Sequence, residues 1–211
     1  MNSRSAILAG LVLAVAALAG CATPIAGQIN SLSAKKSCCA ALSEIEASST
    51  LIGKIDLAFT DSTPAFLFET GLSPFIAVAL PEGSEEKVLE IRATPEMMAV
   101  TKGNSLIFTP IAATFMDSLG RPIVAEQDSG IVATNGGAMY MFIIARKIKV
   151  PKGATRVIVY SNARLHGTSQ TFEYKTVSYL FPVGNAFIPV GGASQVTAIY
   201  GVNGTFTIRL E

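Results

Sequence analysis

The chain has 211 residues, 50% of them hydrophobic and only 15% charged, with a formal net charge of +1. This length and apolar content are sufficient for a well-buried core. The only adjacent basic residues are Lys35-Lys36 and Arg146-Lys147. A nucleic-acid partner is therefore not expected, because binding the phosphate backbone needs an extended positive surface.

The N-terminus has the pattern of a bacterial lipoprotein signal peptide. Arg4 precedes an almost continuous apolar run that ends in the sequence Leu-Ala-Gly-Cys at Cys21. A basic start, a short apolar run and small residues before the cut define a secretory signal, and a cysteine directly after the cut completes a lipobox. We predict that residues 1–20 are removed and that Cys21 carries a diacylglycerol. The alternatives are a conventional signal with Cys21 a plain thiol, or a transmembrane anchor, for which the run is too short.

The predicted lipid makes a membrane the first partner of the chain. A diacylglycerol already gives stable anchoring, because each buried methylene contributes about 0.8 kcal/mol. The residue after the cysteine is Ala22, whereas an Asp there retains lipoproteins in the inner membrane of enteric-type bacteria. We therefore expect the protein on the periplasmic face of the outer membrane.

Residues 21–36 are mostly small and polar, which favours a tether between the lipid and a folded domain over residues 37–211. A weak amphipathic pattern over residues 39–48, with Ser37 as a cap, predicts a short helix at the start of the domain. The adjacent Cys38 and Cys39 leave three alternatives: a vicinal disulfide, two free buried thiols or an intermolecular bridge.

The rest of the chain predicts short strands separated by glycine, proline and other turn residues. The apolar runs that indicate strands lie at residues 55–59, 65–69, 75–80, 88–93, 106–108, 111–116, 139–144, 156–160, 198–200 and 206–210. This spacing favours an all-β fold, an antiparallel β-sandwich or jelly roll with a short N-terminal helix. One domain is expected, with two small sandwiches as the alternative.

Two segments near the C-terminus carry more specific predictions. Residues 198–200 and 206–210, joined by Asn203-Gly204, are expected to form a closing hairpin. Residues 181–190 are apolar, punctuated by proline and long for a loop. They either dock a partner protein or the membrane, or pack across the end of the sandwich.

Catalytic and metal-binding patterns are weak, so no enzyme activity, cofactor or metal is expected. His166 is the only histidine and lies in a predicted turn; a dyad with Cys38 or Cys39 is a remote alternative. Three of the four aspartates, Asp61, Asp117 and Asp128, precede serine in turn-like sequences, where aspartate ordinarily caps its own turn. Calcium ligation by these aspartates is the alternative.

The last third of the chain contains a candidate ligand surface. Its tyrosines are Tyr160, Tyr174, Tyr179 and Tyr200. Aromatic faces with amide groups nearby can bind an oligosaccharide. The alternative is that these tyrosines belong to the core and the edges of the sandwich.

Several short motifs together resemble the maltose operon periplasmic protein family. They are the lipobox, the Cys38-Cys39 pair, the segment Pro64-Ala-Phe-Leu-Phe68 and the C-terminal segments 156–160 and 204–210. The resemblance extends from Lys36 to the C-terminus. It implies a soluble periplasmic body near the outer membrane, encoded in some bacteria beside sugar-uptake machinery. It implies no enzyme activity and provides no catalytic residues.

The sequence thus predicts a non-catalytic outer-membrane lipoprotein, an accessory binding protein that contacts an envelope or transport assembly. A carbohydrate-binding module linked to maltose or maltodextrin uptake is the alternative, and a hydrolase is the third. The chain contains no Trp, which favours the accessory protein over the carbohydrate module.

Cells fed labelled palmitate test the predicted anchor. The wild-type chain should incorporate the label, and the Cys21→Ser variant should incorporate none, because its hydroxyl is not the thiol that the lipobox reaction modifies. Undiminished label in the variant would contradict the prediction.

Overall fold

The computed structural model describes residues 25–95, 105–126, 128–134, 143–183 and 186–211, with the backbone alone at residues 105, 133–134, 174–183 and 186–194. The fold over these residues is all-β, as the sequence predicts. Its strands are β1 (Ser49–Thr50), β2 (Lys54–Phe59), β3 (Ala65–Phe68), β4 (Gly71–Ala79), β5 (Val88–Ala93), β6 (Ser105–Phe108), β7 (Ile111–Met116), β8 (Pro122–Ile123), β9 (Val132–Thr134), β10 (Ile143–Lys149), β11 (Arg156–Ser161), β12 (Ser169–Val183), β13 (Ala186–Tyr200) and β14 (Gly204–Leu210). The helical elements are α2 (Ile25–Ser33) and the 3₁₀ turns η1 (Leu42–Glu44) and η2 (Ala163–Leu165).

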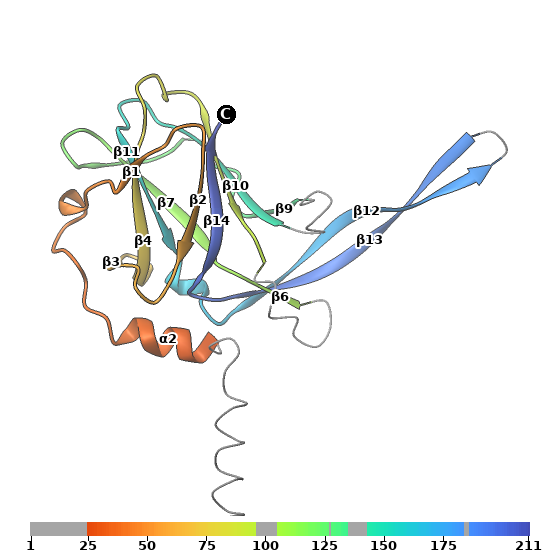
Figure 1. Ribbon diagram of the computed structural model, residues 1–211, viewed down its shortest axis with the longest axis horizontal. Coiled ribbons are helices and arrows are strands. Elements are labelled where there is room, and N and C mark those ends of the chain that lie inside the picture. The colour runs from red at the N-terminus through yellow and green to blue at the C-terminus, as the bar shows by residue number, and fades with distance from the viewer. Residues whose placement is uncertain (1–24, 96–104, 127, 135–142, 184–185) are drawn as a thin grey trace, which may run out of the picture.

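The described strands form two large sheets and one small sheet. One large sheet has the order β1-β4-β11-β7-β8, with β3 added beside β4, and the other has the order β2-β14-β5-β10-β9. The small sheet has the order β12-β13-β6. Most pairs are antiparallel; β1 with β4 and β13 with β6 are parallel. The two large sheets form the sandwich at the left of Figure 1.

Buried and exposed side chains alternate along the strands, and the buried ones form one continuous core between the two large sheets. In β14, Phe206 and Ile208 are buried, whereas Thr207 and Arg209 alternate with them on the outer face. Buried side chains from both sheets and from the small sheet belong to a single cluster. Phe59 and Phe206 make its closest described ring contact, with centroids 4.7 Å apart. The two large sheets and the small sheet therefore share one core.

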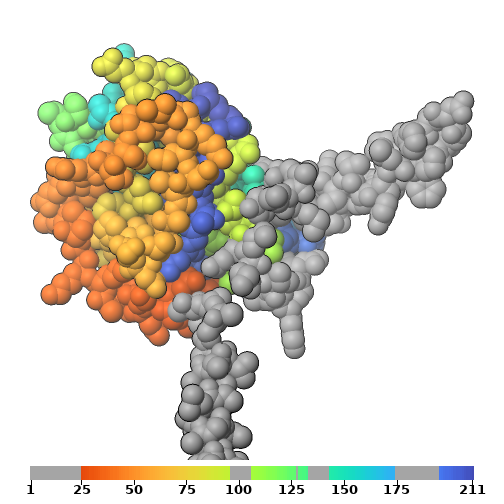
Figure 2. Space-filling view, viewed as in Figure 1, coloured from red at the N-terminus to blue at the C-terminus, as the bar shows by residue number. Residues whose placement is uncertain are grey.

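The six-stranded sheet is apolar on both faces. In β11, Val157 and Val159 lie in the main core, whereas Ile158 lies in a second cluster on the opposite face. Phe66 and Phe68 of β3 belong to this second cluster. The segment around η1 packs against it through Leu42 and Ile45 and so separates it from water. Residues from the N-terminal part of the described chain, red to orange, cover this side of the body in Figure 2.

The helical predictions need correction. Residues 25–33, which we assigned to a tether, form helix α2 at one end of the sandwich (Figure 1). Leu32 packs against Ala65 and Val202, and Gln28 is buried and accepts hydrogen bonds from the backbone N–H of Val202 at 2.9 Å. The predicted helix over residues 39–48 is wrong, because only the single turn η1 forms there.

The corner after β13 explains why helix α2 can approach so closely. Gln28 Oε1 also accepts from the N–H of Asn203 at 3.2 Å, so one amide satisfies two donors of the corner. A Cβ at Gly201 would lie 3.0 Å from the same oxygen. Glycine therefore leaves the space that the Gln28 side chain needs.

Two predictions for the C-terminal region are also wrong. Strands β13 and β14 are not a closing hairpin: β13 pairs with β12 and β6, and β14 pairs with β2 and β5. Residues 181–190 are not a loop, because they form the ends of β12 and β13 around residues 184–185. The other predicted strands are confirmed, except that residues 139–142 of one lie outside the described residues.

The substitution Gln28→Ala tests how firmly α2 is docked. It removes the acceptor of two buried backbone donors, and we expect the free energy of unfolding to fall by about 1–3 kcal/mol. Urea titration followed by circular dichroism measures this, with the exposed Asn30→Ala as the matched control. Equal stability of the two variants would show that the Gln28 hydrogen bonds contribute nothing to the docking of α2.

Candidate interaction surface

Strands β12 and β13 leave the sandwich together and project well beyond it, as Figure 1 shows. Their base is fixed in the core: Phe172 is 9% exposed and is the register partner of Val196, which is 5% exposed. Beyond this pair we call residues 173–183 of β12 and 186–195 of β13 the arm. The arm is therefore a rigidly rooted extension of the sandwich.

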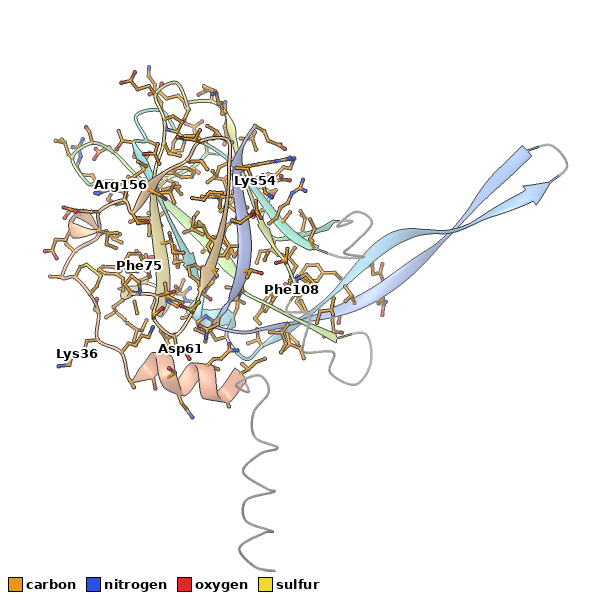
Figure 3. The ribbon with its side chains drawn as sticks, viewed as in Figure 1. Lys36, Lys54, Asp61, Phe75, Phe108 and Arg156 are labelled. Carbon is orange, nitrogen blue, oxygen red and sulfur yellow. A yellow bond between two sulfur atoms is a disulfide. The ribbon has the colours of Figure 1, made fainter. Side chains whose placement is uncertain are left out.

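Tyr200 and Phe108 strengthen the root of the arm. Both are 1% exposed and belong to the main core. The Tyr200 hydroxyl donates to Gln170 Oε1 at 3.0 Å, and burial raises the pKa of Tyr200 to about 12. Phe108 ends β6, which pairs with β13 only over Thr197–Tyr200, and its side chain lies where the sandwich meets the arm (Figure 3).

The arm has two strand edges without a described partner strand. Strand β12 pairs only with β13 among the described strands, and β13 has β6 as a second partner only near the sandwich. At about 3.3 Å per residue, residues 173–183 span roughly 35 Å. Open edges carry unpaired N–H and C=O groups that can pair with another chain.

The sequence of the arm is unusually apolar. No Asp, Glu, Lys, Arg or His occurs between Lys175 and Arg209. Register partners near the tip are Phe181 with Ile188 and Pro182 with Phe187. A half-solvated strand shows polar residues at alternate positions, and residues 179–183 and 186–190 lack that alternation.

A two-stranded ribbon of this kind is only marginally stable in water by itself. Contiguous apolar surface that projects from a protein is typical of a contact site. Proline, which has no N–H to donate, occurs near the tip of each strand as Pro182 and Pro189. Because proline limits strand addition at the tip, the tip favours contact through side chains and the rest of β12 favours strand pairing.

The four predicted ligand-binding tyrosines do not form one surface. Tyr160 lies on β11 and stacks on Phe68, with ring centroids 3.9 Å apart. Tyr200 is buried at the root of the arm, so it cannot stack on a sugar. Tyr174 and Tyr179 are positions of β12 in the arm, whose side chains lie outside the described ones.

The predicted cysteine sites have different outcomes. Cys21 lies outside the described residues. Cys38 and Cys39 form a disulfide with each other. Cys39 packs beside the second apolar cluster, and the backbone N–H of Cys38 donates to the carbonyl of Ala65 at 2.8 Å. The pair therefore fastens the start of the domain to β3.

The structure reveals a serine–histidine contact that the sequence reasoning missed. Ser161 Oγ and His166 Nε2 are 2.7 Å apart, at the end of β11 and just after η2. Such a contact can activate a nucleophile, but Ser161 is 0% exposed and a substrate cannot reach it. Burial lowers the pKa of His166 from 6.5 to about 4. The pair therefore acts as a structural clasp.

The carboxylates are engaged in structural contacts. The N–H groups of Leu119 and Arg121 donate to Asp117 Oδ1 at 2.9 and 2.8 Å, and the N–H of Gly130 donates to Asp128 Oδ1 at 2.9 Å. These two turn predictions are confirmed. Asp61, near α2 in Figure 3, instead accepts from Asn203 Nδ2 at 2.9 Å.

Glu90 is the most deeply buried carboxylate among the described side chains, at 2% exposure. Arg92 Nε donates to it at 2.8 Å, and Arg209 Nε lies 2.9 Å from the same oxygen, Oε2. Lys147 Nζ lies 3.6 Å from Oε1. Three cations from β5, β14 and β10 therefore surround Glu90 on the outer face of the five-stranded sheet.

Other candidate sites are weaker than the arm. A shallow groove of about 530 Å³ over β2 and β14 is lined by Lys54, Asp56 and three threonines, without a tyrosine. No cluster of three or more metal-ligating side chains occurs within the described part of the chain. None of the helices described there has the length and apolar character needed to cross a membrane.

The burial of His166 predicts a pH-dependent stability. In the unfolded state His166 binds a proton near pH 6.5, whereas in the folded state it does so only near pH 4. The free energy of unfolding is therefore highest above pH 6.5 and falls as the pH drops toward 4. With partial solvent screening, we expect a loss of about 2 kcal/mol at pH 4.5. Urea titrations should show a shallower pH dependence in His166→Gln, and identical profiles would refute the lowered pKa of His166.

No family model, no curated protein and no solved structure matches the chain. The resemblance to the maltose operon periplasmic protein family therefore stays a prediction from short motifs.

Proposed function

We propose that this chain is a non-catalytic lipoprotein on the periplasmic face of the outer membrane. It acts as an accessory binding protein of an envelope or transport assembly, and the arm is its contact surface. The lipid on Cys21 supplies the attachment, and the sandwich serves as the rigid base from which the arm reaches its partner.

The single observation that supports this proposal is the arm itself. It extends roughly 35 Å beyond the core pair Phe172–Val196 and has no charged residue after Lys175. A protein that joins an assembly needs a projecting contact surface, and the arm provides one. Apolar anchors at the centre of an interface provide most of its binding energy.

Carbohydrate binding receives less support from the same structure. A sugar site needs exposed aromatic faces close together. Tyr200 is buried, and Tyr160 lies in a different sheet, stacked on Phe68. The groove beside Lys54 offers hydroxyl groups but no tyrosine face.

Crosslinking in intact cells tests the role of the arm. The tagged, lipidated chain is crosslinked, the outer membrane is isolated, and partners are identified by mass spectrometry. We expect a stoichiometric outer-membrane protein to be captured by the wild type. The variants Phe181→Asp and Ile188→Asp should reduce capture at least tenfold, because each places a charge where an apolar contact forms (about 2 kcal/mol or more per anchor).

The matched controls change exposed apolar residues of the sandwich. Leu67 is 64% exposed and Val124 is 87% exposed, so Leu67→Asp and Val124→Asp add the same charge without affecting the arm. Both should capture the partner as the wild type does. Equal capture by all four variants, or a partner lost only in the controls, would refute the arm as the contact surface.

A further inference from the structure

Beyond the proposed function, we infer that the edge of β12 joins this chain to a second copy of itself in a two-fold symmetric, antiparallel strand pair centred on Tyr174. The inference does not use the apolar tip of the arm. It depends on an open strand edge, on the register along β12 and on the two charges of the arm.

The open edge provides the backbone part of the contact. Strand β12 pairs with β13 on one side, and its other edge has no hydrogen-bonded partner among the described strands, although β9 lies close to part of β12. A two-fold axis through the centre of such an edge brings the same strand of a second copy beside it in antiparallel orientation. Over residues 171–177 the β12–β13 register is regular, with an irregularity only between Val177 and Tyr179. This regular stretch is the part of β12 suited to strand addition.

The charges select the register and the occupant. Glu173 and Lys175 are the only charged residues of the arm, and they flank Tyr174. Antiparallel pairing about Tyr174 makes Glu173 of one copy the register partner of Lys175 of the other, and the symmetry repeats the pair. Directly opposed residues of antiparallel strands share one face, where opposite charges attract and like charges repel. The edge is therefore complementary to itself.

The position of Glu173 fits this contact. Glu173 is exposed, directly beyond the buried Phe172, and its Oε1 accepts from Gln195 Nε2 at 3.0 Å. That hydrogen bond holds the carboxylate at the root of the arm, where its position is fixed by the core. A carboxylate has two oxygens, and Oε2 provides an acceptor for the ammonium group of a lysine from the second copy.

Charge exchange tests the inference on the full lipidated chain. Copies with donor or acceptor fluorophores on C-terminal tags are mixed in detergent, and energy transfer is followed against concentration. In Glu173→Lys and in Lys175→Glu, both symmetric contacts become repulsive, so self-association should weaken about tenfold. Lys152→Glu and Glu82→Lys, which alter exposed charges of the sandwich, should associate as the wild type does.

The decisive samples combine the changes. The double variant E173K/K175E restores opposite charges across the axis and should regain wild-type association within about threefold. The two single variants, each weak alone, should associate with each other equally well, because every contact between them is again a Lys–Glu pair. Wild-type association of the single variants, or failure of both the double variant and the mixture to recover, would overturn the inference.

The same variants separate this inference from the proposed function. One result is that, in crosslinked cells, Glu173→Lys keeps the outer-membrane partner that Phe181→Asp loses. That result would show that the tip of the arm binds its partner without pairing between two copies of the chain. The opposite result is that the charge-exchange variants associate as expected but Phe181→Asp does not reduce capture of the partner. That result would support the pairing of two copies and refute the proposed role of the tip.

Discussion

The antiparallel pairing of β12 with β13, rooted in the core by Phe172, Val196 and Tyr200, is the interaction on which the shape of this molecule depends. Without the buried root, two strands of this length would form only a marginal ribbon in water. With it, the chain holds an apolar, almost uncharged arm away from the sandwich. The buried root therefore fixes where the arm leaves the sandwich and which residues it presents beyond the core.

The two large sheets of the sandwich have outer faces that are either polar or covered, although single apolar side chains such as Leu67 and Val124 are exposed. The five-stranded sheet presents a polar outer face, where Glu90 is surrounded by Arg92, Lys147 and Arg209. The apolar outer face of the six-stranded sheet is covered by β3 and by the segment around η1. The backbone N–H of Cys38 joins the start of this segment to β3 by donating to the carbonyl of Ala65. Helix α2 packs against the end of the sandwich through Leu32 and Gln28.

Local pattern predicted most of the sandwich, since alternation in stretches such as residues 88–93 and 206–210 is fixed by burial of one face. The errors share a physical cause: they depend on distant contacts. Helix α2 has a weak pattern of its own and forms because the corner after β13 offers two N–H donors to Gln28. Residues 181–190 contain two prolines and a Gly-Asn pair, which predicted a loop, yet the long β12–β13 register continues through them. The Ser161–His166 contact arises from the turn η2, which no sequence motif marks.

The central claim is that the open edge of β12 becomes paired when the protein assembles. Hydrogen–deuterium exchange of residues 169–183, measured at low and high concentrations of the lipidated chain, tests it most directly. The account predicts that amides of β12 exchange more slowly at high concentration, while those of β2, an edge strand of the sandwich, do not change. Exchange of β12 that is rapid and independent of concentration would contradict the account.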